Sequence, residues 1–144
     1  MSARFSVGVA GLVVRDGAVL LLKRAATKSY WPGEWAPVTD KLEACESPEA
    51  GLRREVREET RLTVDVEADP IGTWHIPNGA GQDDLIGITF VCPYVSGRVL
   101  LSDEHDAHEW VAIRDLGRVP LVAPLRPAFE RLKALFTMAR ELNP

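Results

Sequence analysis

The chain has 144 residues, which is the size of one ordinary domain and is enough to bury a hydrophobic core without disulfide or metal staples. Its 46% hydrophobic and 26% charged residues are typical of a globular protein, and its net charge of −4 argues against a large nucleic-acid surface. No apolar run reaches the length of a membrane span, so we expect no membrane partner.

The first predicted elements form a hairpin. Residues 4–14 are rich in Val and Leu, Asp16-Gly17 is a strong turn signal, and residues 18–23 are predicted to be the returning strand. A basic residue precedes the apolar run, as in a signal peptide. No clear small-residue cleavage site follows it, so a strand is favoured. Residues 25–38 contain two prolines, a glycine and two tryptophans and are predicted to be a loop.

A helix is predicted to begin after Ser47, with Pro48 at its first position, and to end near Thr60. A second helix is predicted over 124–142, where several large apolar residues can share one broad face. Those residues are Leu125, Phe129, Leu132, Leu135, Phe136 and Met138. Between the helices, short strands are predicted at 62–67, 70–76, 85–94, 97–101 and 109–113, with a loop at 79–84.

The order of strands, helix, strands and helix predicts an α/β (α+β) fold, in which a mixed sheet packs between helices. We see no linker or repeat, so residues 1–144 are expected to form a single domain. Cys45 and Cys92 are far apart and lack a metal-ligand spacing, so both are interpreted as free thiols. This agrees with a cytoplasmic location.

Three carboxylates on the first helix are the strongest chemical signal. Glu55, Glu58 and Glu59 lie at i, i+3 and i+4, so they occupy one wedge of the helix and repel each other. A hard cation such as Mg²⁺ would remove that repulsion, although spacing alone favours the commoner explanation, a solvated face. Gly51 lies on the same wedge. It either leaves room for metal and phosphate or allows close packing against a neighbouring loop.

Residues 40–62 resemble the Nudix box, a loop–helix signature written G-x5-E-x7-R-E-U-x-E-E-x-G-U, where U is a bulky aliphatic residue. Glu46 matches the first glutamate, and Arg54-Glu55 follow at the required distance. Glu58-Glu59 match the paired glutamates. Val56 and Leu62 match the aliphatic positions. The match is long and spaced, and it is therefore far more specific than a short motif.

The resemblance implies a Nudix-like α/β/α sandwich and a Mg²⁺-dependent hydrolase, with Mn²⁺ as a substitute. It implies that Glu55, Glu58 and Glu59 are catalytic residues and metal ligands, together with the backbone carbonyl of Thr39. It also implies that Glu46 and Arg54 support the loop and the helix. By family analogy, the expected partners are a small nucleotide and a second copy of the chain in a homodimer.

Two positions depart from the family pattern, because Asp40 and Arg61 replace the two box glycines. Asp tolerates left-handed backbone better than most residues, and its charge could either add a metal ligand or repel a phosphate. Arg61 stands where a helix usually ends on a left-handed glycine, at a cost of roughly 1 kcal/mol for another residue. We expect the fold to survive both changes.

Candidates outside the box are less specific. Glu104, in a predicted loop, is the first candidate for a further catalytic carboxylate, as a metal ligand or general base, and His105 is the second. A solvated acidic loop is an equally good interpretation. Four residues are candidates for binding substrate through a phosphate or by stacking on a base, although surface solvation or core packing is their usual role. They are Arg24, Lys41, Trp35 and Trp74.

The favoured hypothesis is a hydrolase that cuts a diphosphate linkage in a nucleoside diphosphate-X compound, with a nucleoside triphosphate first among the candidates. ADP-ribose, a nucleotide sugar or a dinucleotide polyphosphate are alternatives. A nucleotide sensor without turnover is a different hypothesis, which the two missing glycines favour and the complete set of box glutamates disfavours. The least specific hypothesis, an α/β domain with a solvated acidic helix, does not explain the spacing of the box.

Overall fold

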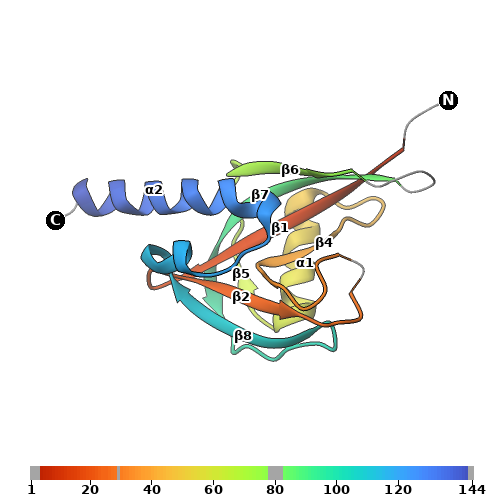
Figure 1. The fold of residues 1–144 in the computed structure, drawn as a ribbon, viewed down its shortest axis with the longest axis horizontal. Coiled ribbons are helices and arrows are strands. Elements are labelled where there is room, and N and C mark those ends of the chain that lie inside the picture. Colours follow the sequence, from red (N-terminus) through yellow and green to blue (C-terminus); the bar gives the residue numbers. More distant parts are fainter. Residues whose placement is uncertain (1–3, 29, 78–82, 143–144) are drawn as a thin grey trace.

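In a computed structural model, which describes residues 4–28, 30–77 and 83–142, strand β1 (Phe5–Arg15) lies at the centre of a mixed sheet (Figure 1). It pairs in parallel with β7 (Asp84–Ser96) along one edge. Along its other edge it pairs antiparallel with β4 (Val38–Lys41) and then with β2 (Ala18–Arg24). Neighbours on both edges and burial on both faces explain why β1 is almost continuously apolar.

The remaining strands extend the sheet from β2 and β7, and all of these pairings are antiparallel. Strand β2 pairs with β3 (Trp35–Ala36) and β8 (His105–Ala112), whereas β7 pairs with β5 (Thr63–Val64) and β6 (Gly72–Ile76). The mixed sheet predicted from the sequence is confirmed.

Alternate residues of β1 supply two separate cores, one on each face of the sheet. Val9 and Val13 pack on the side of helix α1 (Pro48–Thr60), against Leu52 and Val56. Ala10 and Leu12 belong to the other core, which includes Phe129 of helix α2 (Arg126–Leu142). Because side chains alternate across a strand, one sheet can support a helix on each face. The expected α/β/α sandwich is confirmed.

Helix α1 begins and ends as the sequence indicates. The Ser47 hydroxyl accepts a hydrogen bond from the Ala50 N–H, and Pro48 occupies the first turn. At the other end Arg61 has φ 66°, in the left-handed region, and its N–H donates to the Arg57 carbonyl. The chain therefore accepts a left-handed arginine where the family pattern has glycine, at a cost of about 1 kcal/mol.

The strand predicted at 97–101 is wrong. This segment instead runs along the end of α1, where the Leu100 N–H donates to the Thr60 carbonyl and the Ser102 N–H donates to the Glu59 carbonyl. Helix-terminal carbonyls lack partners within the helix, so they can accept hydrogen bonds from a neighbouring segment. This contact holds the chain before β8 against the box helix.

Other boundaries also differ from the prediction. The predicted loop at 25–38 contains β3 and the first residue of β4, and β8 begins at His105 rather than at 109. Most of the loop predicted at 79–84 lies outside the described residues, and Asp84 already belongs to β7. Both cysteines are free, as predicted. Among the described residues, no helix has the length and apolarity needed to cross a membrane.

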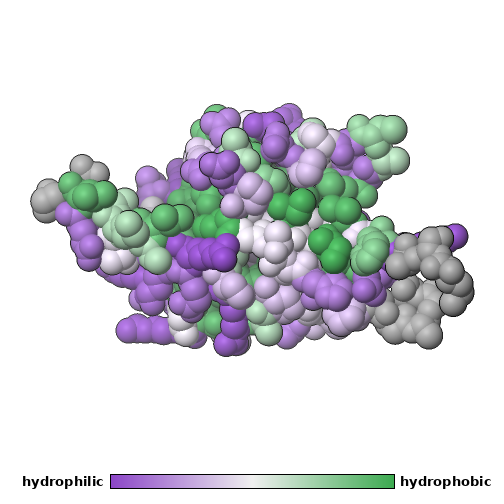
Figure 2. All heavy atoms as spheres, turned by 90° about the horizontal axis from the view of Figure 1, so that it is seen from above, coloured by the Kyte–Doolittle hydropathy of each residue, from purple (hydrophilic) through white to green (hydrophobic). Residues whose placement is uncertain are grey.

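Helix α2 buries only part of its predicted apolar face. Two short 3₁₀ turns, Ile113–Arg118 and Ala123–Leu125, lead into it, and Leu125, Phe129 and Leu132 are buried. The later part projects beyond the sheet (Figure 1), and its Leu135 and Met138 side chains are exposed. Figure 2 shows apolar surface at this end of the molecule.

The loop before α1 is tied to the helix by a two-pronged ion pair. The Arg54 guanidinium donates from Nε to Glu46 Oε2 at 2.9 Å and from Nη2 to Glu46 Oε1 at 2.6 Å. Glu46 Oε1 also accepts the Glu43 N–H at 2.9 Å. The hydrogen bonding from Arg54 has the largest effect on the pKa of Glu46, followed by the Glu43 N–H, and together they lower it to about 2. The pairing that the box resemblance implied is therefore present.

Gly51 provides the space that this loop needs. A Cβ at this position would lie 2.4 Å from Leu42 Cδ2 and 2.9 Å from Glu46 Oε1. Of the two interpretations of Gly51, the structure supports close packing of helix against loop, because the space that a side chain would need is filled by this chain.

We expect Gly51→Ala to destabilise the protein by about 1–3 kcal/mol, because a Cβ would force Leu42 and the fixed Glu46 carboxylate to move. Urea unfolding measures this. Helix propensity alone predicts the opposite sign, a gain of about 1 kcal/mol. The control is Ala50→Gly at the exposed neighbouring position, which should lose about 1 kcal/mol by propensity. An unchanged or more stable Gly51→Ala variant would contradict the packing role.

Candidate active site

Three elements brought together by the sheet line an acidic groove of about 600 Å³: β4, α1 and the segment before β8. The Ala25 N–H donates to the Glu104 carbonyl at 3.0 Å, and the neighbouring Ser102 N–H donates to the Glu59 carbonyl. These bonds set the Glu104 backbone beside α1. The groove therefore contains every candidate catalytic carboxylate named from the sequence, Glu55, Glu58, Glu59 and Glu104, and also Asp40.

The three helix glutamates lie in different environments. Glu58 has a 60% exposed side chain and accepts a hydrogen bond from Arg54 Nη1 at 3.1 Å. Glu55 is buried and accepts from the same Nη1 at 2.6 Å. Glu59 is 1% exposed, and neither of its carboxylate oxygens has a hydrogen-bond partner among the described residues. A buried, ionised and unpaired carboxylate is costly, so Glu59 requires either a proton or a cation.

The raised pKa values of Glu59 and Glu55 show the same need for a proton or a cation. Burial, and then the charge of Glu55, raise the pKa of Glu59 to about 9. Burial also raises the pKa of Glu55, as do its hydrogen bond to Asp40 and the Asp40 charge, whereas Arg54 opposes the shift. The carboxyl groups of Glu55 and Glu59 thus hold protons at neutral pH unless a bound cation replaces the protons.

The groove fits a hard divalent cation. Carboxylate oxygens are the ligands that Mg²⁺ and Mn²⁺ prefer. The two Glu59 oxygens, which have no hydrogen-bond partner among the described residues, are available to bind such a cation. Ligand atoms of Asp40, Glu59 and Glu104 all lie within 4.8 Å of one another. Thr39 precedes Asp40 in β4, and its hydroxyl donates to the Pro37 carbonyl at 3.0 Å.

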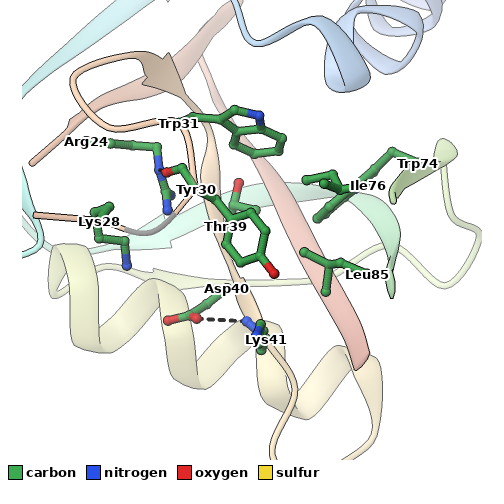
Figure 3. Close-up of a pocket in the computed structure, with 10 residues that line it drawn as sticks. All are labelled: Arg24, Lys28, Tyr30, Trp31, Thr39, Asp40, Lys41, Trp74, Ile76 and Leu85. Carbon is green, nitrogen blue, oxygen red and sulfur yellow. Dashed lines mark hydrogen bonds between the residues drawn. The ribbon is translucent and has the colours of Figure 1, made fainter. Parts of the chain in front are cut away.

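A second, smaller cavity of about 180 Å³ adjoins the groove (Figure 3). Figure 3 shows basic, aromatic and apolar side chains around it, with Asp40 toward α1. Asp40 lines both the cavity and the groove. The lining of the cavity comprises Arg24, Lys28, Tyr30, Trp31, Thr39, Asp40, Lys41, Trp74, Ile76 and Leu85.

Of the four substrate-binding candidates, Arg24, Lys41 and Trp74 line this cavity. Trp35 is not among the lining residues. It lies in β3 and packs against the core on the α2 side of the sheet. Tyr30 also lines the cavity, although it belongs to no motif; the sequence signal for it is its place beside Trp31 in an aromatic loop.

The cations around the cavity are held in distinct ways. Arg24 is buried, and its Nε donates to the Tyr30 carbonyl at 2.7 Å, so it fixes the aromatic loop. Lys41 Nζ lies 5.4 Å from the Tyr30 ring centroid, where a cation is attracted to the ring face. Lys28 forms an ion pair with Glu104 at 3.3 Å, which links the cavity wall to the groove.

His105, the second candidate for a general base, lines neither hollow. It is 5% exposed, and neither ring nitrogen has a hydrogen-bond partner among the described residues. Burial, followed by the charge of Arg24, lowers its pKa to about 4. The structure therefore favours Glu104 over His105 as the late groove residue.

Without metal, we expect stability to fall as pH rises from 6.5 to 9. In this window the folded state keeps a proton on Glu59, whose pKa is about 9, while the unfolded state, with its ordinary value of 4.5, has lost it. The folded state then binds more protons, so the free energy of unfolding decreases with pH. The lowered pKa of His105 acts below 6.5 and that of Glu46 below 4.5, outside the window.

Thermal unfolding in EDTA measures this slope. Glu59→Gln should make it shallower, and the part that remains comes from Glu55, whose pKa is about 8. Added Mg²⁺ should raise the melting temperature more at pH 9 than at pH 6.5, because protons compete with the cation at lower pH. Parallel pH profiles of the wild type and Glu59→Gln would refute this account of Glu59.

The comparisons with known proteins agree with the architecture. The NUDIX domain family model matches residues 3–132. Proteins named nucleoside triphosphatase NudI, from Escherichia coli O17:K52:H18 and from Shigella flexneri, are 33% identical over 135 residues, which cover 88% of this chain and 95% of theirs.

Solved structures agree as well. The MutT protein from Methanosarcina mazei Go1 has a TM-score of 0.79 and 30% identity, with 100% of this chain and 99% of that chain covered. The MutT NUDIX hydrolase from Burkholderia pseudomallei has a TM-score of 0.76 and 27% identity, with 90% and 98% covered. The family model spans most of the chain, and the three glutamates on the box helix line one groove. This chain belongs to the Nudix family and is a Nudix hydrolase.

Proposed function

We propose that this Nudix pyrophosphohydrolase cuts a diphosphate linkage in a nucleoside triphosphate and uses Mg²⁺ to do so, with Mn²⁺ as a substitute. The proposal rests on two hollows with opposite chemistry that adjoin each other at Asp40, which lines both. One is aromatic and basic, and the other is lined with carboxylates. Relatives that are named nucleoside triphosphatase, and that align with most of this chain, support the substrate class.

The small cavity suits one moiety of a nucleotide. At about 180 Å³ it is smaller than the roughly 300–1,000 Å³ that enclose a complete drug-sized ligand. Trp31 and Trp74, whose ring centroids lie 5.8 Å apart, offer apolar faces for a base. Arg24 and Lys41 supply positive charge for phosphate oxygens.

The acidic groove would hold the metal. In our proposal Glu55, Glu58 and Glu59 bind the cation, together with the Thr39 backbone carbonyl. When bound, the ion neutralises the diphosphate and lowers the pKa of the attacking water. Arg54 and Glu46 hold the helix and its preceding loop in place, since their hydrogen bonds span both elements.

The reaction transfers a phosphoryl group to water. A water oxygen forms a bond to one phosphorus, the bond from that phosphorus to the bridging oxygen breaks, and two phosphate-bearing products leave. Glu104, which lies in the groove and is paired with Lys28, is our candidate for a further metal ligand or for the group that accepts the proton of the water.

A substrate panel tests the proposal directly. We expect Mg²⁺- or Mn²⁺-dependent product release from nucleoside triphosphates, and none in EDTA. ADP-ribose, nucleotide sugars and dinucleotide polyphosphates belong in the same panel, because preferential turnover of one of them would reassign the substrate class. Binding of nucleotide without turnover of any compound would contradict the proposal and favour the sensor hypothesis.

Glu59→Gln should reduce turnover by at least about a hundredfold, because the buried carboxylate would lose its charge toward the cation. Its fold should persist, as measured by circular dichroism and thermal unfolding. Glu49→Gln is the matched control, since Glu49 is exposed in the first turn of the same helix. Glu58→Gln should also lose activity. Near-wild-type rates in both the Glu58 and Glu59 variants would exclude the proposed metal-binding face.

A further inference from the structure

Asp40 is one of two groove residues that depart from the box pattern, where the first position is glycine; the other is Arg61. It lies in β4, opposite Val9 of β1, and is absent from the described non-glycine residues with positive φ. One oxygen of its carboxylate accepts the Lys41 N–H at 2.8 Å (Figure 3). The aspartate therefore occupies ordinary extended backbone, and its side chain needs an explanation other than a turn.

That side chain brings a third carboxylate close to two others. Ligand atoms of Asp40, Glu59 and Glu104 lie within 4.8 Å of one another, although they come from β4, from α1 and from the segment before β8. Like charges at this distance repel strongly at a partly buried site. The neighbouring Lys28 pairs with Glu104, at 3.3 Å. The buried Arg24 also lies close enough for its charge to act on all three carboxylates. Two cations beside three carboxylates leave the cluster with an excess of negative charge.

Glu59 supplies independent evidence that a ligand belongs there. Its side chain is almost completely buried, and both of its carboxylate oxygens lack hydrogen-bond partners among the described residues. An isolated buried carboxylate normally finds donors or a metal ion, because desolvation without compensation is expensive. The unpartnered group faces the two other carboxylates, so a cation between them satisfies all three at once.

We propose that Asp40, which stands where the box pattern has glycine, is a metal ligand, and that Asp40, Glu59 and Glu104 hold a divalent cation before any nucleotide binds. Mg²⁺ and Mn²⁺ sites commonly take several ligands from substrate phosphates. A glycine at position 40 offers no side-chain ligand, whereas Asp40 provides one from the protein. The inference rests on the groove assigned under the proposed function, but it concerns binding without substrate.

The test is a titration of the nucleotide-free, full-length protein with Mn²⁺, in which the free ion is followed by electron paramagnetic resonance and binding heat by calorimetry. We expect Asp40→Asn and Asp40→Gly to weaken Mn²⁺ binding at least tenfold. Asp103→Asn is the matched control, because Asp103 is exposed in the same groove and loses the same charge, but lies outside the three-carboxylate cluster. It should change affinity by less than threefold.

The competing explanation is that Asp40 only repels phosphate. It predicts unchanged or tighter Mn²⁺ binding in Asp40→Asn, and that result would overturn the inference. Equal weakening in Asp40→Asn and Asp103→Asn would also overturn it, because the effect would then be general charge. Thermal unfolding in EDTA checks the fold of each variant. If Asp40→Asn does not fold, Asp40→Gly, which restores the residue of the box pattern, carries the test.

Substrate turnover separates this inference from the proposed function. Metal-dependent turnover by a wild-type protein that binds no Mn²⁺ without nucleotide would overturn the inference and leave the function standing. Asp40-dependent Mn²⁺ binding in a protein that turns over no nucleotide would support the inference and overturn the function.

Discussion

The buried carboxylate of Glu59 imposes the electrostatic condition to which the rest of the site responds. It lies at the junction of the box helix, the sheet and the segment before β8, where it is almost completely buried and has no hydrogen-bond partner among the described residues. Its neighbours Glu55, Asp40 and Glu104 are acidic as well, so the fold concentrates negative charge instead of neutralising it. Such an arrangement costs stability unless a cation is part of the working protein.

A frame of ion pairs around Arg54 holds the loop and the box helix together, and its rigidity allows the fold to tolerate this cost. Arg54 joins Glu46 in the loop to Glu55 and Glu58 on the helix, and Gly51 lets the loop approach closely enough for the pair to form. Arg54 pairs with Glu46, Glu55 and Glu58, and none of its hydrogen bonds reaches Glu59. Lys28 and Arg24 offset only part of the negative charge around Glu59, and a bound cation would offset the rest.

The neighbouring cavity presents the opposite environment, with three basic side chains and several aromatic rings. A nucleotide is itself divided in this way, into an apolar base and charged phosphates that bind cations. Asp40 lines both hollows and so lies where the two environments meet.

Local features of the sequence determined the Asp16-Gly17 hairpin, both ends of α1 and the shared face of the box glutamates, because each depends on residues within a few positions of one another. The family resemblance extended this to the α/β/α architecture. Tertiary structure alone decided that Glu104 and Asp40 meet Glu59, that Trp35 packs in the core while Tyr30 lines the cavity, and that 97–101 follows the helix end instead of forming a strand. These outcomes depend on contacts between residues far apart in the chain, which no local periodicity encodes.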